Sequence, residues 1–146
     1  MAETTRSLGE EWLVLAPSAE ALGAVPLFAS MPEHARQRLA GLLEIEHHGA
    51  GHVIVRQGQS GYAFYVVADG AVVVTQDDAV LRELGRGDYF GELAIVGDGG
   101  RTAAVTAATD VVLWALFGTH FRELQMSEPA VAAELQDAVT QRWAHE

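Results

Sequence analysis

The chain has 146 residues, of which 49% are hydrophobic, and a net charge of −11 at neutral pH. This length and apolar content suffice for one sizeable core, so a single globular domain is expected. The acidity opposes binding to nucleic acid or to an acidic membrane surface, and the lack of cysteine excludes disulfides, thiolate catalysis and cysteine-ligated zinc.

The first 23 residues are expected to form a helical leader that packs on the rest of the chain. Apolar residues 12–15 are followed by Pro17, and Ser18 is a suitable N-cap for a short helix containing Leu22. The first six residues lack the profile of a secretion signal, and no apolar run is long enough to span a bilayer. These features predict a cytoplasmic protein without membrane insertion.

The chain then changes from helical to β patterning. Proline suits a first helical turn and leucine recurs at helical spacing, so a helix is predicted from Pro32 to about Leu43. From Glu44 to Leu116 short β-branched runs alternate with glycine and aspartate, which predicts a β-sandwich or barrel. Examples of these runs are Val53–Val55, Phe64–Val67, Val72–Thr75 and Val111–Trp114. Residues 76–79 have the composition of a hairpin turn.

Helical patterning returns after Leu116. A short helix is predicted over Thr119–Leu124 and a longer one from Ser127, which should cap it, with Pro129 in its first turn. One face of the longer helix carries residues at spacings of three and four, namely Val131, Leu135, Ala138, Val139 and Arg142. This face must be covered either by the chain's own sandwich or by the twin helix of a homodimer, and the sequence leaves both open.

Residues 90–105 form a segment of small residues with one carboxylate, Glu92, and nine residues later one guanidinium, Arg101. A carboxylate accepts hydrogen bonds from sugar hydroxyls, while a guanidinium donates a forked pair to phosphate oxygens. Arg101 is also the only cation between Asp88 and Asp110. The spacing therefore suits a ligand with hydroxyls at one end and an anion at the other.

The segment closely resembles the phosphate-binding cassette of the cyclic nucleotide-binding domain. The family pattern is Phe-Gly-Glu, an apolar residue, Ala, a short variable loop, then Arg, a small residue and Ala. Its positions are filled here by Gly91, Glu92, Leu93, Ala94, Arg101, Thr102 and Ala103. Gly100 stands where the family usually has proline. Residues 51–74 also look like the family's opening strands, and the likeness extends over about residues 24–143.

The resemblance implies a fold of mainly β character with additional helices. The expected architecture is a double-stranded β-helix, the cupin-like jelly roll, with N-terminal and C-terminal helices. It would span residues 24–146 and follow the leader, residues 1–23. In the family the final helix also closes over the base, and Arg142 or Trp143 could supply that lid here.

The resemblance also implies how the ligand is held. Glu92 would bind the ribose 2′-hydroxyl and Arg101 the cyclic phosphate. The remaining cradle groups would be the amides of Leu93 and Ala94 and the hydroxyl of Thr102.

Other kinds of site are weakly supported. His47, His48 and His52 lie close in sequence, but adjacent histidines on a strand point to opposite faces and no carboxylate completes a metal set. The chain has no lysine and therefore no Gly-x-x-x-x-Gly-Lys phosphate loop. Glu92 has no partner acid for general acid–base work. We therefore expect no enzyme activity, no metal and no cofactor beyond the ligand.

The leading interpretation is a stand-alone sensor that binds a cyclic nucleotide, cAMP rather than cGMP, and repositions its flanking helices to act on a protein effector. A homodimer through the C-terminal helix is a further option. The alternative is a scaffold or interaction protein that keeps the fold without binding a ligand, for which Gly100 is the hint. A transcription factor is disfavoured because no helix-turn-helix follows the last predicted helix.

Overall fold

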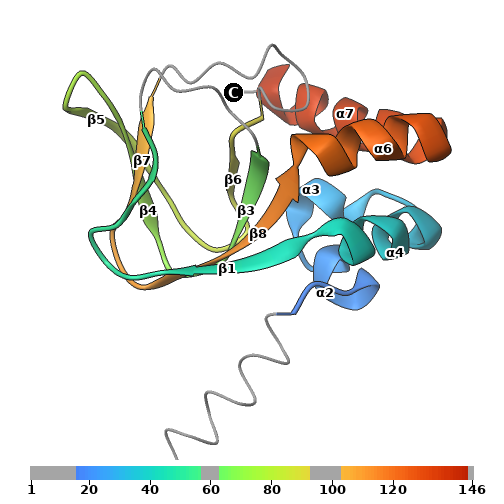
Figure 1. Cartoon of the computed structure of the whole chain (residues 1–146), viewed down its shortest axis with the longest axis horizontal. Helices are drawn as coiled ribbons and strands as arrows, with labels where there is room; N and C mark the ends of the chain where they lie inside the picture. Colours follow the sequence, from blue (N-terminus) through green and yellow to red (C-terminus); the bar gives the residue numbers. More distant parts are fainter. Residues whose placement is uncertain (1–15, 57–62, 93–102, 145–146) are drawn as a thin grey trace, which may run out of the picture.

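The structure is a computed structural model that describes residues 16–56, 63–92 and 103–144, with side chains of the last helix described to Gln141. Figure 1 shows a β-sandwich on one side and a layer of helices on the other. Helices that precede the strands and helices that follow them lie on the same side of the sandwich. The helical layer therefore combines segments from both ends of the described chain.

Among the described residues, three helices precede the sandwich: α2 (Ala19–Gly23), α3 (Pro26–Ala29) and α4 (Glu33–Leu42). The predicted cap of the first is confirmed, because the Ala21 amide donates to Ser18 Oγ at 3.0 Å. The predicted second helix is confirmed as α4, which begins one residue after Pro32.

The strands form two antiparallel four-stranded sheets. The first has the order β1 (Glu44–His48), β8 (Val111–Phe117), β3 (Ala63–Asp69), β6 (Tyr89–Phe90). The second has the order β2 (Val53–Val55), β7 (Ala104–Ala107), β4 (Val72–Gln76), β5 (Ala79–Leu84). Apart from β4 and β5, strands consecutive in sequence lie in different sheets, which confirms the predicted jelly roll. The four β-branched runs named above all lie in strands.

The predicted hairpin turn joins β4 to β5. Asp77 and Asp78 have φ of 52° and 66°, so both central residues adopt the left-handed conformation of a tight hairpin turn. The predicted turn implies a strand after it, which is β5, but its bounds were not predicted. Its sequence ends in Arg82-Glu83-Leu84 and only Leu84 is buried, so this edge strand lacks the apolar pattern of an inner strand.

Two helices follow the sandwich, α6 (Gly118–Ser127) and α7 (Pro129–Ala144). The prediction that Ser127 caps the second helix is wrong: it ends α6, and its hydroxyl donates to the Glu123 carbonyl at 2.9 Å. An ion pair between Arg38 of α4 and Glu128 joins the N-terminal helices to the junction of α6 and α7.

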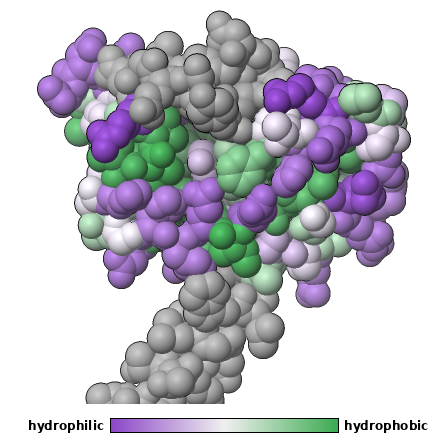
Figure 2. All heavy atoms as spheres, viewed as in Figure 1, coloured by the Kyte–Doolittle hydropathy of each residue, from purple (hydrophilic) through white to green (hydrophobic). Residues whose placement is uncertain are grey.

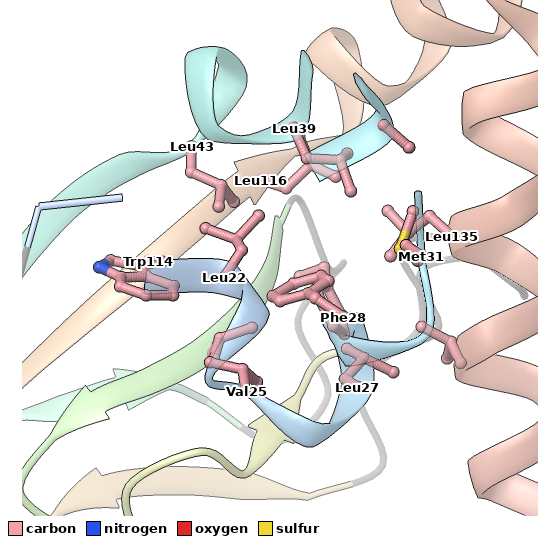
Figure 3. Packing of buried hydrophobic residues seen from close by; sticks show 14 of the residues in the cluster. Leu22, Val25, Leu27, Phe28, Met31, Leu39, Leu43, Trp114, Leu116 and Leu135 are labelled. Carbon is pink, nitrogen blue, oxygen red and sulfur yellow. The ribbon is translucent and has the colours of Figure 1, made fainter. Parts of the chain in front are cut away.

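Two apolar clusters lie on opposite faces of the first sheet. The outer cluster packs Phe64, Val66, Trp114 and Leu116 against the five helices of the described residues, and Figure 3 shows part of this packing. The inner cluster fills the sandwich and includes Val67, Val72, Leu84, Phe90, Val105 and Leu113. Alternation along β3 assigns neighbouring residues to different clusters.

The apolar face of α7 is covered by the chain itself. Val131, Leu135 and Val139 are at most 4% exposed and belong to the outer cluster, where α7 packs on α3, α4 and α6. Its cover is therefore the helical layer together with the outer face of the first sheet. A homodimer through α7 would need a different face of the helix.

The face in Figure 2 is largely hydrophilic, with an apolar area over the sheet that holds β4 and β7. The large exposed apolar side chains of the described residues are Val80, Leu81 and Met126. Within residues 16–56, 63–92 and 103–144, no helix combines the length and apolar character needed to cross a bilayer.

Candidate ligand-binding site

The cassette begins at the end of β6, inside the sandwich. The Phe90 ring is 4% exposed and stacks on the Tyr65 ring, with centroids 4.9 Å apart and an interplanar angle of 18°. Gly91 then turns the chain with a φ of 80°, a conformation that favours glycine. Glu92 follows and is half-buried. The carboxylate is thus only two residues from a side chain buried between the sheets.

The cassette ends on the same apolar cluster. Ala103 is half-buried and packs against the inner cluster, and the next strand, β7, contributes the buried Val105 and Ala107 to it. The fold therefore brings three predicted site residues, Gly91, Glu92 and Ala103, to the part of the sandwich where β6 ends and β7 begins. A ligand held here would contact an apolar interior on one side and the cassette on the other.

The other predicted site residues cannot be placed in this way. Leu93, Ala94, Arg101 and Thr102 lie outside the described residues. The proposed lid residues, Arg142 and Trp143, fall within α7, and their side chains also lie outside the described part.

The turn before β6 is fixed to β3 by backbone hydrogen bonds. The Gly87 amide donates to the Val67 carbonyl and the Val67 amide donates to the Asp88 carbonyl, both at 2.8 Å. The Asp88 carboxylate accepts from the Gly85 amide, also at 2.8 Å. Gly87 has a φ of 90°, so glycine suits this position. These bonds set where β6 starts and therefore where Gly91 and Glu92 lie.

Tyr65 is the neighbour of the site that sequence reasoning missed. It lies directly opposite Phe90 in the pairing of β3 with β6. An aromatic residue in an early strand gives no local sign of the strand it pairs with, because that register is set by the whole sandwich. The useful signal would have been the Phe of the cassette motif, which requires an apolar partner.

The histidines near β1 form a polar group without metal-site geometry. The His48 and His52 rings stack with centroids 4.9 Å apart, and His48 Nε2 lies 2.9 Å from Glu46 Oε1. Partial desolvation, and then repulsion from His48, lowers the pKa of the exposed His47. No group of three or more His, Asp or Glu side chains among the described residues is arranged to hold a metal ion.

The chain is similar in sequence to a known protein family and to several of its members. The family model described as the cyclic nucleotide-binding domain matches residues 45–128. A cGMP-dependent protein kinase of Drosophila melanogaster is 40% identical over 93 residues, which cover 59% of this chain and 12% of the kinase. A cyclic nucleotide-gated potassium channel of Rhizobium etli is 34% identical over 121 residues, covering 83% of this chain and 34% of the channel.

A solved structure shows the same fold with a ligand. The regulatory domain of Toxoplasma gondii PKA, co-crystallised with cAMP, superposes with a TM-score of 0.75 at 28% identity. The match covers 90% of this chain and 50% of that one. The chain thus spans about a third or less of the length of the two curated relatives and half of this structure. Since the family model covers more than half of its residues, the chain belongs to the cyclic nucleotide-binding domain family.

Proposed function

We propose that the chain is a regulatory, non-catalytic sensor domain that binds a cyclic nucleotide, cAMP in preference to cGMP, at the cassette between β6 and β7. The observation that carries the proposal is the position of the cassette. Its first residues follow the stacked Tyr65–Phe90 pair, and its last residue packs on the same inner cluster. Relatives named as cAMP- and cGMP-dependent proteins and as a cyclic nucleotide-gated channel support the ligand class.

In this proposal the ligand is recognised at two ends. Glu92 accepts hydrogen bonds from the ribose, while Arg101 and the amides of Leu93 and Ala94 hold the cyclic phosphate, with the Thr102 hydroxyl beside them. The chain has a net charge of −11, so the negative charge of the ligand must be neutralised by a cation close to it. Arg101, the only cation between Asp88 and Asp110, would supply the neutralising positive charge.

The same cassette explains how binding could be signalled. A ligand shifts a conformational equilibrium by contacts that differ between two states. β6 leads directly into the cassette, and its two residues contact both apolar clusters. A change at the cassette on binding would therefore be transmitted to the helical layer, which would present the signal to a protein effector.

Thermal unfolding with each nucleotide tests the proposal. A ligand at about one hundred times its dissociation constant stabilises the folded state by roughly 2.7 kcal/mol. We expect cAMP to raise the unfolding midpoint at a lower concentration than cGMP does. If neither nucleotide raises it at millimolar concentration, the chain keeps the fold without the ligand, and the scaffold interpretation prompted by Gly100 replaces the sensor.

The Arg101→Ala variant tests the site itself. Hydrogen bonds to charged groups contribute about 1.5–3 kcal/mol, so the affinity for cAMP should fall by roughly one to two powers of ten. Calorimetry or a fluorescent analogue would measure the change. Arg122→Ala is the matched control, because it removes the same charge from an exposed position on α6. Equal affinities of the two variants would contradict the role of Arg101.

A further inference from the structure

A cavity of about 630 Å³ lies between α2, α3 and the outer face of the first sheet. Part of its lining is apolar and buried: Val67, Ala68 and Trp114 are at most 5% exposed. Ser18 and Arg86 also line it, and both are exposed. Figure 3 shows the Trp114 ring beside Leu22 and Val25, with the indole nitrogen directed away from the cluster.

This cavity is distinct from the nucleotide site. Ala68 and Trp114 belong to the outer cluster, whereas the two ends of the cassette pack on the inner cluster. Val67, which also lines the cavity, belongs to the inner cluster, and Gly87 lies in the turn before β6. The described cassette residues Gly91, Glu92 and Ala103 do not line the cavity. An occupant would therefore contact the helical layer and this turn without covering those three residues.

The chain immediately before the cavity has a composition that fits it. Ser18 is part of the lining, and residues 12–15, Trp-Leu-Val-Leu, lie only a few positions earlier. Four consecutive apolar residues gain free energy when they leave water, and a tryptophan ring buries a large area. The tether also keeps this segment at high effective concentration beside the cavity.

Charge favours the same occupant. Arg86 lines the cavity and forms no ion pair with any described residue. Glu10 and Glu11 directly precede the apolar run, so one of them can reach the guanidinium when the run enters the cavity. Glu20 also lines the cavity and is exposed.

We propose that residues 12–15 dock in this cavity, with Trp12 over the apolar lining and an acidic residue of the preceding pair next to Arg86. The docked segment packs against α2 and α3 and extends the helical layer over the end of β3. The inference is independent of nucleotide binding.

Disulfide trapping tests this docking cleanly, because the chain has no cysteine of its own. The test pair is Leu13→Cys with Ala24→Cys, and the control pair is Leu13→Cys with Ser30→Cys. Ala24 and Ser30 are a matched couple: both are exposed C-caps of short helices, with φ of −83° and −84° and ψ of −9°. Only Ala24 lines the cavity.

The two hypotheses give different ratios of the intramolecular oxidation rates. For a freely moving leader, loop closure scales with the −3/2 power of loop length, so the rates should agree within about two-fold. Docking should make the Ala24 pair at least about ten-fold faster, and Trp12→Ala should return the ratio to about two. Similar rates for both pairs would overturn the proposal. A covalent dimer from the Ala24 pair would also overturn it and assign the cavity to a second copy of the chain.

Discussion

Gly70 begins the turn between β3 and β4 at a position where a larger residue is strained. Its φ is 89°, and an added Cβ would lie 3.0 Å from Thr109 Oγ1 and closer still to the Asp110 carbonyl oxygen. Gly70→Ala should lower the free energy of unfolding by about 2–4 kcal/mol, because left-handed strain and steric overlap both contribute. Urea unfolding would measure the loss.

Gly51→Ala separates these two causes. Gly51 has the same φ of 89°, but an added Cβ would meet nothing within 4 Å. Only the conformational strain remains, so the expected cost is about 1–2 kcal/mol. If both variants lost the same free energy, the close approach of Asp110 and Thr109 would have no measurable effect.

His47 gives a second prediction for a single residue. Desolvation, and then the neighbouring His48, lowers the pKa of His47 below 6.5. A lowered pKa means that the unfolded chain binds the proton more readily, so stability should decrease as the pH falls through and below 6.5. The effect is modest because the ring is exposed. Proton NMR titration should show a low pKa that moves toward 6.5 in His48→Gln, and an unchanged value would contradict the charge repulsion.

The β4–β5 hairpin carries a prediction for an element. Asp77 and Asp78 both have positive φ, which aspartate tolerates better than β-branched residues do. Asp78→Val should therefore destabilise the protein by about 1–2 kcal/mol, whereas Asp78→Asn should remain within about 0.5 kcal/mol of the parent. Chemical unfolding would measure the stability of both variants. Equal stabilities would show that the backbone at the hairpin tip adjusts to valine without loss of free energy.

Most elements could be predicted where the signal is local. Ser18 marked the start of α2, Pro32 that of α4, and the aspartate pair the hairpin. Local signals failed where a tertiary neighbour decides the outcome. Ser127 has the chemistry of a cap, yet its hydroxyl bonds back to Glu123 because α6 continues through it. β5 is an exposed edge strand whose structure depends on pairing with β4, which its own sequence does not reveal.

At the scale of the whole molecule, the candidate site also combines local features that the sequence predicts with tertiary contacts that it does not. The cassette could be proposed from the sequence because its residues lie within one short segment, and in the structure Gly91 and Glu92 follow β6 while Ala103 precedes β7. The stacking of Tyr65 on Phe90 and the packing of α7 on the N-terminal helices were not predictable. Both join segments far apart in sequence, so they follow from topology and not from any local pattern.

The two-residue strand β6 connects the candidate site to the helical layer. Tyr89 and Phe90 point to opposite faces of the sheet: the Tyr89 ring lies 5.5 Å from Phe64 of the outer cluster, and Phe90 stacks on Tyr65 inside the sandwich. A change of the cassette at Gly91 must therefore move groups that contact both clusters. Coupling through β6 is expected if the sensor proposal holds.

Hydrogen exchange with and without cAMP measures this coupling. In the parent protein we expect cAMP to change exchange in α6 and α7. Tyr89→Leu keeps the position apolar but removes the ring, so that change should fall to less than about half while affinity changes less than about three-fold. Phe121→Leu is the control, because it removes a ring from the outer cluster on α6 without altering β6. A full response of the helices in Tyr89→Leu, with cAMP still bound, would show that the signal bypasses this strand.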